Sequence, residues 1–264
     1  MNPIIQKLLS ISPVFRSIAI CRLGQHSFLV KADDIIIAFD PYLTADNNRL
    51  IASLISPDDF CNIDVICCSH DHGDHIDRQA LKAMAQASPN AVFIVPEAVK
   101  NSISEISSER MIGMNDEETV SVGNIQIKAI AAAHEMLDQT AEGLYPYLGY
   151  IVSVNGVSIY HSGDCCVYEG LLSKLKKSIP DIMLLPINGR DAVRLKNNCI
   201  GNMTYQEAAD LAGWCGTSMV IPAHYDMFHG NLENPELFMD YMAVKYPMVR
   251  SKIMHPGEIY EIIF

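Results

Sequence analysis

Three histidines and two aspartates lie in one short run, residues 69–75 (Ser-His-Asp-His-Gly-Asp-His), directly after an apolar, strand-like segment. Buried imidazole and carboxylate groups each need a polar partner, and a metal ion can serve several of them at once. The N/O donor set suits Zn, Mn or Fe(II). His70, His72 and Asp74 alternate and can converge on one side, whereas His75 must point elsewhere. This spacing predicts two neighbouring ions, and the alternative is a polar surface turn that binds nothing.

Further candidate ligands occur later in the chain. His134, Asp164 and His224 each come just after the end of a predicted strand, so one sheet edge could bring them to the cluster. We assign His70, His72 and His134 to the first ion and Asp74, His75 and His224 to the second, with the Asp164 carboxylate bridging the two.

Composition narrows the class of protein. The chain has 264 residues, 49% of them hydrophobic, which is ample for a sizeable core. A net charge of −12 argues against binding to a nucleic-acid backbone, although a small anionic substrate remains compatible with a few focused cations. Eight cysteines without regular spacing fit reduced, buried thiols. Neither a signal peptide nor an apolar run near the roughly 20 residues of a membrane span is found, so we expect a cytoplasmic protein without membrane partners.

The elements that must position these residues alternate between strand and helix. β-branched runs at 17–22, 26–31 and 34–39 predict an antiparallel meander. Further strands are predicted at 64–69, 91–95, 118–122, 125–132, 148–154, 157–160, 181–186, 218–221 and 259–264. Helices are predicted at 77–86, 204–212 and 235–244, and one more begins at Pro96. No linker or fixed-period repeat divides the chain. We therefore expect one α/β domain over residues 1–264, in which two sheets pack face to face with helices outside.

The cluster and the later ligands together resemble the metallo-β-lactamase superfamily. Its His-x-His-x-Asp-His signature is met by residues 70–75. The later residues of the family pattern are matched by His134, Asp164 and His224, and its early structural aspartate by Asp40. The resemblance spans nearly the whole chain and implies an αββα four-layer sandwich with a binuclear site on one edge.

The residues around these motifs favour one branch of that superfamily. His75 is followed by Ile76-Asp77, where glyoxalase II and the β-lactamases typically have Gly-Gly, and this departure disfavours both. The segments 23–28 (LGQHSF), 160–164 (YHSGD), 186–190 (PINGR) and 202–204 (NMT) are similar to the UlaG-like branch, which contains L-ascorbate-6-phosphate lactonase. The chain is shorter than those lactonases, and its His134 stands where some of them use a carboxylate. These differences leave the substrate and the metal open.

The resemblance implies a metal-dependent hydrolase with two divalent ions, Mn(II) or Zn(II), which make hydroxide available near neutral pH. We expect a lactonase that opens a phosphorylated sugar-acid lactone such as L-ascorbate 6-phosphate, with Asp74, Asp164 and His224 as catalytic residues. Asp74 either shuttles the proton of the water or acts as a ligand alone. The alternatives are a phosphodiesterase or phospholipase D-like hydrolase of the same fold and, in another class, a non-hydrolytic metal-binding or redox protein. His72 speaks against the diiron redox relatives, which tend to carry Glu there.

A phosphorylated substrate needs cations away from the reacting bond. Arg190 offers a bidentate fork for phosphate or carboxylate, with Asn188 and Arg194 beside it as further candidate substrate-binding residues. The alternative is a solvated loop in which the arginine pairs with Asp191. His26, just beyond the first strand, either binds substrate or caps a turn.

Two further features concern the surroundings of the site. His161 precedes Asp164 closely and is expected to orient it or a neighbouring ligand. Residues 135–147 follow His134 and form either a flap over the cleft or an oligomer contact. Because relatives in this branch often assemble, we expect a homo-oligomer.

Overall fold

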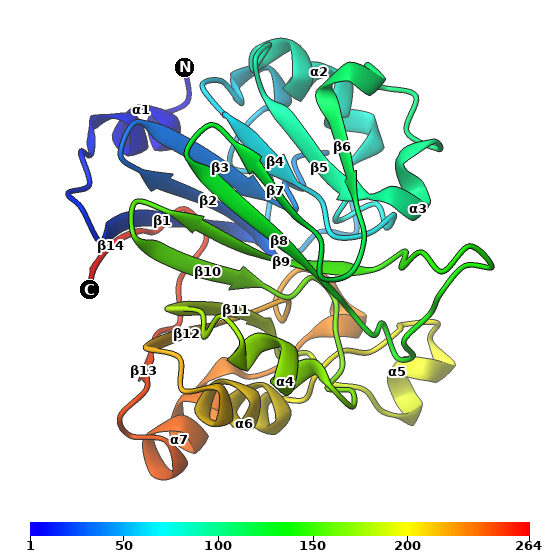
Figure 1. Cartoon of the computed structure of the whole chain (residues 1–264). Helices are drawn as coiled ribbons and strands as arrows, with labels where there is room; N and C mark the ends of the chain where they lie inside the picture. The colour runs from blue at the N-terminus through cyan, green and yellow to red at the C-terminus, as the bar shows by residue number, and fades with distance from the viewer.

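Two seven-stranded β-sheets face each other in the computed structural model, which describes all 264 residues (Figure 1). The first sheet consists, in spatial order, of β14 (Ile259–Ile263), β1 (Ser17–Gly24), β2 (Ser27–Ala32), β3 (Ile35–Phe39), β4 (Val65–Cys67), β5 (Val92–Pro96) and β6 (Met111–Met114). The second consists of β13 (Arg250–Ser251), β12 (Met219–Ala223), β11 (Ile182–Pro186), β10 (Val157–His161), β9 (Leu148–Val154), β8 (Ile125–Ala131) and β7 (Thr119–Val122). Every predicted strand is present.

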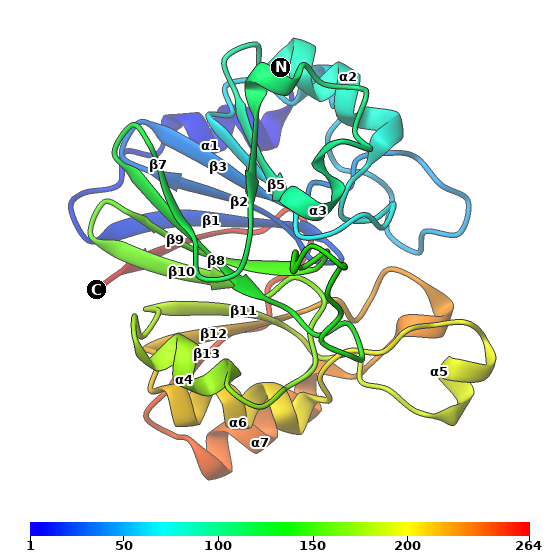
Figure 2. The same ribbon diagram turned by 45° about the vertical axis from the view of Figure 1, so that its right-hand side comes forward.

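Helices cover the outer faces of both sheets (Figures 1 and 2). The first sheet carries α1 (Pro3–Ser10), α2 (Arg78–Ala87) and α3 (Glu97–Lys100), and the second carries α4 (Leu171–Lys176), α6 (Tyr205–Cys215) and α7 (Pro235–Lys245). The short helix α5 (Ala192–Lys196) projects from one edge. The expected αββα four-layer sandwich is confirmed. No helix is long and apolar enough to cross a membrane.

Successive side chains of each strand point to opposite faces of its sheet, so the core consists of one layer between the sheets and one layer under the helices on each outer side. In β1, Ile18 and Ile20 point between the sheets, whereas Ala19 points outward toward the helices. Cys67 and Cys68 likewise face opposite sides, as expected for neighbours in extended chain, and all eight cysteines are free thiols. Each large side chain buried in this way contributes about 1.5–3 kcal/mol. The doubly covered sheets therefore form a rigid support for the loops at their ends.

The sequence analysis missed only short elements. These are α1, β6, α4, α5 and β13, none longer than eight residues. Helix α1 could have been predicted from its first residues, because Asn2 is a favourable N-cap that accepts from the backbone N–H of Ile4, and Pro3 occupies the first helical position. Strand β6 did not, since its sequence Met-Ile-Gly-Met includes a glycine that leaves room for the Glu97 side chain.

Parallel pairing brings the chemical residues to one edge. Strands β3 and β4 run parallel in the first sheet, and β10, β11 and β12 run parallel in the second. Their carboxyl ends therefore lie together, and each is followed by a loop that carries polar residues. Two of those loops begin at residues with positive φ, Asp40 (+40°) and His224 (+58°). Non-glycine residues rarely adopt this conformation, which often marks functional positions.

A buried arginine ties the two sheets together behind this edge. The Arg22 side chain is fully buried and donates through both terminal nitrogens to Asp226, at 2.7 Å each. It also donates to the carbonyls of Met254 and Gln25, and its guanidinium lies 4.7 Å from the centre of the Tyr225 ring. This bidentate pair fixes the chain after β12 against the β1–β2 hairpin.

Replacing this arginine tests that link. We expect Arg22→Met to lower the free energy of unfolding by about 3 kcal/mol, because it leaves the Asp226 carboxylate and two carbonyls without their partner. Chemical denaturation of the purified protein measures the change. Arg16→Met is the matched control: Arg16 pairs with Asp181 at 3.5 Å on the surface, and its loss should cost less than about 1 kcal/mol. Equal effects of the two variants would contradict the assigned role.

Candidate metal centre

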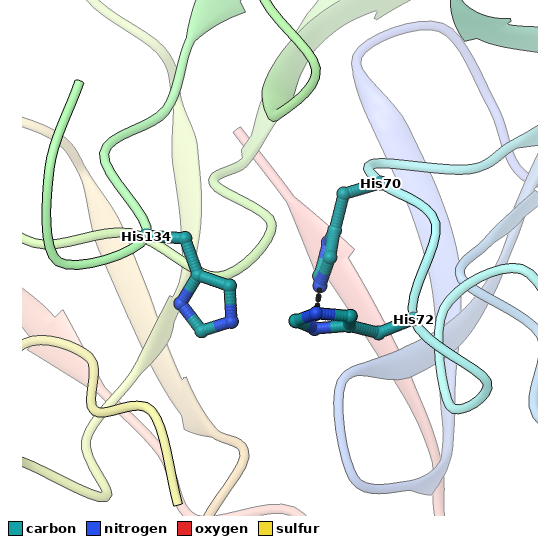
Figure 3. Close-up of side chains that lie close together, drawn as sticks. All are labelled: His70, His72 and His134. Atoms are coloured by element: carbon teal, nitrogen blue, oxygen red, sulfur yellow. Dashed lines mark hydrogen bonds between the residues drawn. The ribbon is translucent and has the colours of Figure 1, made fainter. Parts of the chain in front are cut away.

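The first group of the centre consists of three histidines whose ring nitrogens face one another (Figure 3). His70 and His72 come from the loop after β4, and their Nε2 and Nδ1 atoms lie 2.9 Å apart. His134, which follows β8, completes the group, and one ligand atom of each residue lies within 4.8 Å of the others. Burial lowers the pKa of all three imidazoles, that of His134 to about 4. They are therefore neutral at pH 7, the form that binds metal ions.

The second group combines a carboxylate with two histidines. Asp74 Oδ2 lies 3.5 Å from His75 Nε2 and 3.6 Å from His224 Nε2. Asp74 and His75 belong to the same loop as the first group, whereas His224 follows β12 in the other sheet. Such spacings match the distances between neighbouring ligand atoms around one divalent ion, about 3–3.5 Å for bonds near 2 Å.

Asp164 lies between the two groups. Its Oδ1 is 3.4 Å from His75 Nε2 and 3.2 Å from His224 Nε2, and its Oδ2 is 3.7 Å from His134 Nε2. One oxygen of a single carboxylate thus faces each group. The structure brings together all seven predicted metal ligands.

Electrostatics favour positive charge at the second group. Burial acts to lower the pKa of His75 and His224, but the carboxylates of Asp164 and Asp74 outweigh it and raise these values to about 9 and about 10. Burial likewise acts to raise the pKa of Asp164, yet His224 and His75 hold it well below its usual range. In the ion-free protein, protons on the histidines supply the charge that a divalent ion would supply.

The residues present fit divalent metal ions. Two of the inward-facing ligand atoms, His75 Nε2 and Asp164 Oδ1, are buried without any hydrogen-bond partner. Buried polar atoms are costly when unpaired, and both point at the centre of the site. Nitrogen and carboxylate donors in these proportions suit Zn(II), Mn(II) or Fe(II).

Asp40 and Ser69 hold one histidine of each group in place. Asp40 Oδ2 lies 2.6 Å from His75 Nδ1 and accepts from the Ser69 hydroxyl at 2.6 Å. Asp40 Oδ1 accepts from the Ser69 backbone N–H at 2.7 Å, and Ser69 Oγ is 2.9 Å from His70 Nδ1. These contacts fix the orientation of both rings, so that their Nε2 atoms point toward the other candidate ligands and would be free to hold metal ions.

Two cavities adjoin the ligands. The smaller, of about 260 Å³, is lined by His72, Asp74, His134, Asp164, Asn198, Cys199, Ile200, His224, Phe228 and Asn231. The larger, of about 680 Å³, is lined by Tyr42, Thr44, Ala45, Asp46, Asn47, Asp71, Gly73, Asp74, Ile76, Asp77, Arg78, Gln79 and Phe228. Asp74 and Phe228 line both, so a substrate in the larger cavity would reach the metal ligands past these two side chains.

Both arginines predicted to bind substrate are engaged by carboxylates. Arg190 donates two hydrogen bonds to Glu207, at 2.6 and 2.7 Å. Arg194 pairs with Asp191 and donates to the carbonyl of Leu232. The alternative, in which Arg190 pairs with Asp191, differs from this arrangement, because Glu207 holds Arg190 and Asp191 holds Arg194. The phosphate-binding role of Arg190 stays a prediction.

Asn188 and His26, the other two predicted substrate residues, do not line either cavity. Both are fully buried. Asn188 donates to Asn231 Oδ1 at 2.6 Å, and Asn231 Nδ2 in turn lies 3.4 Å from His224 Nδ1. His26 Nδ1 lies 3.9 Å from Asp164 Oδ1. In the structure these residues stand behind the candidate metal ligands His224 and Asp164, and their contact with substrate stays a prediction.

His161 lies behind Asp164 as well, on the far side of His26. Its Nε2 donates to the His26 carbonyl oxygen at 2.8 Å, and the centre of its ring lies 3.9 Å from that of the His26 ring. Burial lowers the pKa of His161 to about 3, so the imidazole stays neutral and donates to that carbonyl. It thus supports Asp164 through His26 and lines neither cavity.

Residues 135–147 project from the molecule beside the three-histidine group (Figure 1). The Tyr147 ring at their end lies 5.4 Å from the ring of His70 and 5.3 Å from that of His134. Met136 is 72% exposed at the other end. Whether this segment is a flap or an oligomer contact stays a prediction.

Comparisons with known proteins agree with this geometry. A family model described as a beta-lactamase superfamily domain matches residues 36–225. The chain is 30% identical to a UPF0173 metal-dependent hydrolase of Pyrococcus furiosus over 91% of this chain and 97% of the relative. It is 29% identical to one of Archaeoglobus fulgidus over 90% and 96%. Among solved structures, Igni18, a metallo hydrolase from Ignicoccus hospitalis, shares the fold with a TM-score of 0.74 at 22% identity, covering 94% of this chain and 99% of that one.

Removing the shared carboxylate tests the two-ion arrangement. We expect Asp164→Ala to weaken binding of both ions, because each group loses one oxygen donor. Isothermal titration of the metal-free protein with Mn(II) or Zn(II), with elemental analysis of the loaded protein, measures affinity and stoichiometry. Asp138→Ala, an exposed acid on the projecting segment, is the control and should leave both unchanged. Loss of only one ion in Asp164→Ala would refute the bridging role.

Proposed function

We propose that this chain, which belongs to the beta-lactamase superfamily and within it to the UPF0173 metal-dependent hydrolases, opens the ester bond of a lactone. The position of Asp164 carries the proposal. Its two oxygens face two separate ligand groups, the arrangement needed to hold two ions next to one reacting bond. A carboxylic ester is a suitable substrate because its cleavage requires only an activated water and stabilisation of charge on oxygen.

The protein's own residues prepare the site for this reaction. When bound, divalent ions supply Lewis acidity and lower the pKa of water. Asp74 is a ligand-group carboxylate that lines both cavities, and its side chain is 20% exposed. It is therefore placed to accept a proton from the attacking water and to return it to the leaving alkoxide. His224 and Asp164 stay almost fully buried, which keeps bulk water away from the other side.

The larger cavity suits a small polyhydroxylated ring. Its volume of about 680 Å³ lies in the usual range for small-molecule sites. Tyr42 and Phe228, whose rings are 6.2 Å apart, offer apolar walls. Asp46 and Asn47 offer oxygen acceptors for hydroxyl groups. These features support a sugar-type lactone as the substrate.

The charge of that cavity disfavours an added phosphate. Four aspartates line it against one cation, Arg78, which is itself held by Asp71 at 2.7 Å. A phosphate group would meet repulsion there, and the two arginines outside the cavity are already paired. We therefore favour an unphosphorylated lactone over the phosphorylated sugar acid expected from the sequence. The same argument weakens the phosphodiesterase alternative, since a diester brings negative charge to the site.

An assay of the purified protein loaded with Mn(II) or Zn(II) tests the reaction. We expect turnover of five- and six-membered sugar lactones, slower turnover of their phosphorylated forms, and little turnover of bis-p-nitrophenyl phosphate. Ring opening is followed by acid release with a pH indicator. The Asp164→Ala protein under the same conditions is the blank. Hydrolysis of bis-p-nitrophenyl phosphate without hydrolysis of any lactone would contradict the proposed function.

The role of Arg190 is tested with the same substrates. Because its guanidinium is bound by Glu207, we expect Arg190→Ala to change KM by the same factor for phosphorylated and unphosphorylated lactones. Glu207→Gln is the matched control, since it weakens the same pair and keeps the guanidinium. A selective rise of tenfold or more in KM for the phosphorylated lactone would instead establish Arg190 as a phosphate anchor.

A further inference from the structure

The β1–β2 hairpin places an amide side chain inside the second ligand group. Gln25 lies at the turn of this hairpin, in the first sheet, and is fully buried. Its amide Nε2 is 2.7 Å from Asp74 Oδ2 and 2.9 Å from His224 Nε2, the two atoms that face the second ion. Gln25 therefore contacts two metal ligands that come from different sheets.

The backbone holds this side chain in a strained position. Gln25 has φ +50°, a left-handed conformation that non-glycine residues rarely adopt. Its carbonyl accepts from the His224 backbone N–H at 3.0 Å and from the buried Arg22 guanidinium at 3.2 Å. A glycine would form this turn with less strain but would place no side chain in the site.

Without a cation, neither orientation of the Gln25 amide satisfies both of its neighbours. Asn231 Oδ1 accepts from Asn188 and from the Cys199 thiol, so Asn231 Nδ2 is the group that faces His224 Nδ1. In a neutral ring the hydrogen of His224 then lies on Nε2, and a charged ring carries one there as well, so in both cases Nε2 meets the Gln25 NH₂ group, which is also a donor. Turning the amide would remove this conflict but would place its oxygen 2.7 Å from the Asp74 carboxylate.

A cation resolves the conflict. With an ion between them, His224 Nε2 and Asp74 Oδ2 both direct lone pairs inward, and an amide oxygen is the group that fits beside them. Turning the amide would place its oxygen there and would also give that oxygen a partner, because Gln25 Oε1 is buried and unpaired in the present orientation. We propose that Gln25 is a further ligand of the second ion, through its amide oxygen.

This ligand would make the two ion sites chemically different. The three-histidine group offers three nitrogens and one oxygen of Asp164, whereas the second group would offer two nitrogens and three oxygens. Oxygen-rich sets with more donors suit Mn(II) better than Zn(II), which favours four ligands with nitrogen or sulfur. Gln25 would thus bias the second position toward Mn(II).

Three variants of the full-length protein test the proposal through ion binding. Metal-free wild type, Gln25→Leu and Gln25→Glu are titrated calorimetrically with Mn(II) and, separately, Zn(II), after circular dichroism has shown that each is folded. We expect Gln25→Leu to bind the second ion at least tenfold more weakly, with a larger loss for Mn(II), and the first ion unchanged. Gln25→Glu keeps an oxygen at the same place and should bind the second ion at least as tightly as wild type. Gln126→Leu, the same change at an exposed position of β8, should alter neither.

The Glu variant separates a ligand from a hydrogen-bond donor. If Gln25 only donates to Asp74, a glutamate there would repel that carboxylate and weaken the second ion as much as leucine does, which would overturn the proposal. Unchanged binding in Gln25→Leu would overturn it as well. The inference rests on the proposed two-ion centre but not on the proposed lactone substrate. A wild-type protein that binds a single ion would refute the two-ion centre. Two-ion binding that is unchanged in the Gln25 variants would refute only the role of Gln25 as a ligand.

Discussion

The buried carboxylate of Asp40 is the contact on which the site depends. It accepts from the backbone and hydroxyl of Ser69 and lies 2.6 Å from His75 Nδ1. Through Ser69 it also reaches His70, so one carboxylate at the end of β3 orients a histidine of each ligand group. Such networks hold their geometry only when every member is paired, because a buried polar atom that loses its partner costs about 1–3 kcal/mol.

The candidate metal ligands could be predicted from sequence because they are either closely spaced in the chain or placed directly after a predicted strand. His70, His72 and the rest of residues 69–75 are neighbours in the chain, and His134, like the other later ligands, follows a recognisable strand. The layers of the fold could also be predicted, because alternating apolar and polar residues and a high content of β-branched residues indicate strands directly. Short elements with weak patterns, such as β6, carried too few residues to be recognised.

Apart from Asp40 and His161, the supporting residues could not be predicted, since their roles depend on partners distant in sequence. Arg190 looks like an anion site until Glu207, one turn into α6, is seen to hold it. Asn188 looks like a loop residue until its contact with Asn231 places it behind His224. The contacts of Gln25 with Asp74 and His224 could not be predicted for a different reason: amides occur everywhere in proteins, and no spacing rule distinguishes one that faces a ligand group.

The division of ligands between the two sheets also bears on how the protein matures. The first sheet and its loops supply His70 to His75, and the second supplies His134, Asp164 and His224, the last of them only 40 residues before the C-terminus. No half of the chain contains a complete set for either ion. A complete ligand set for either ion would therefore form only once both sheets have docked, so that the folded protein would select the ion. A metal ion bound there would link the two sheets and oppose their separation.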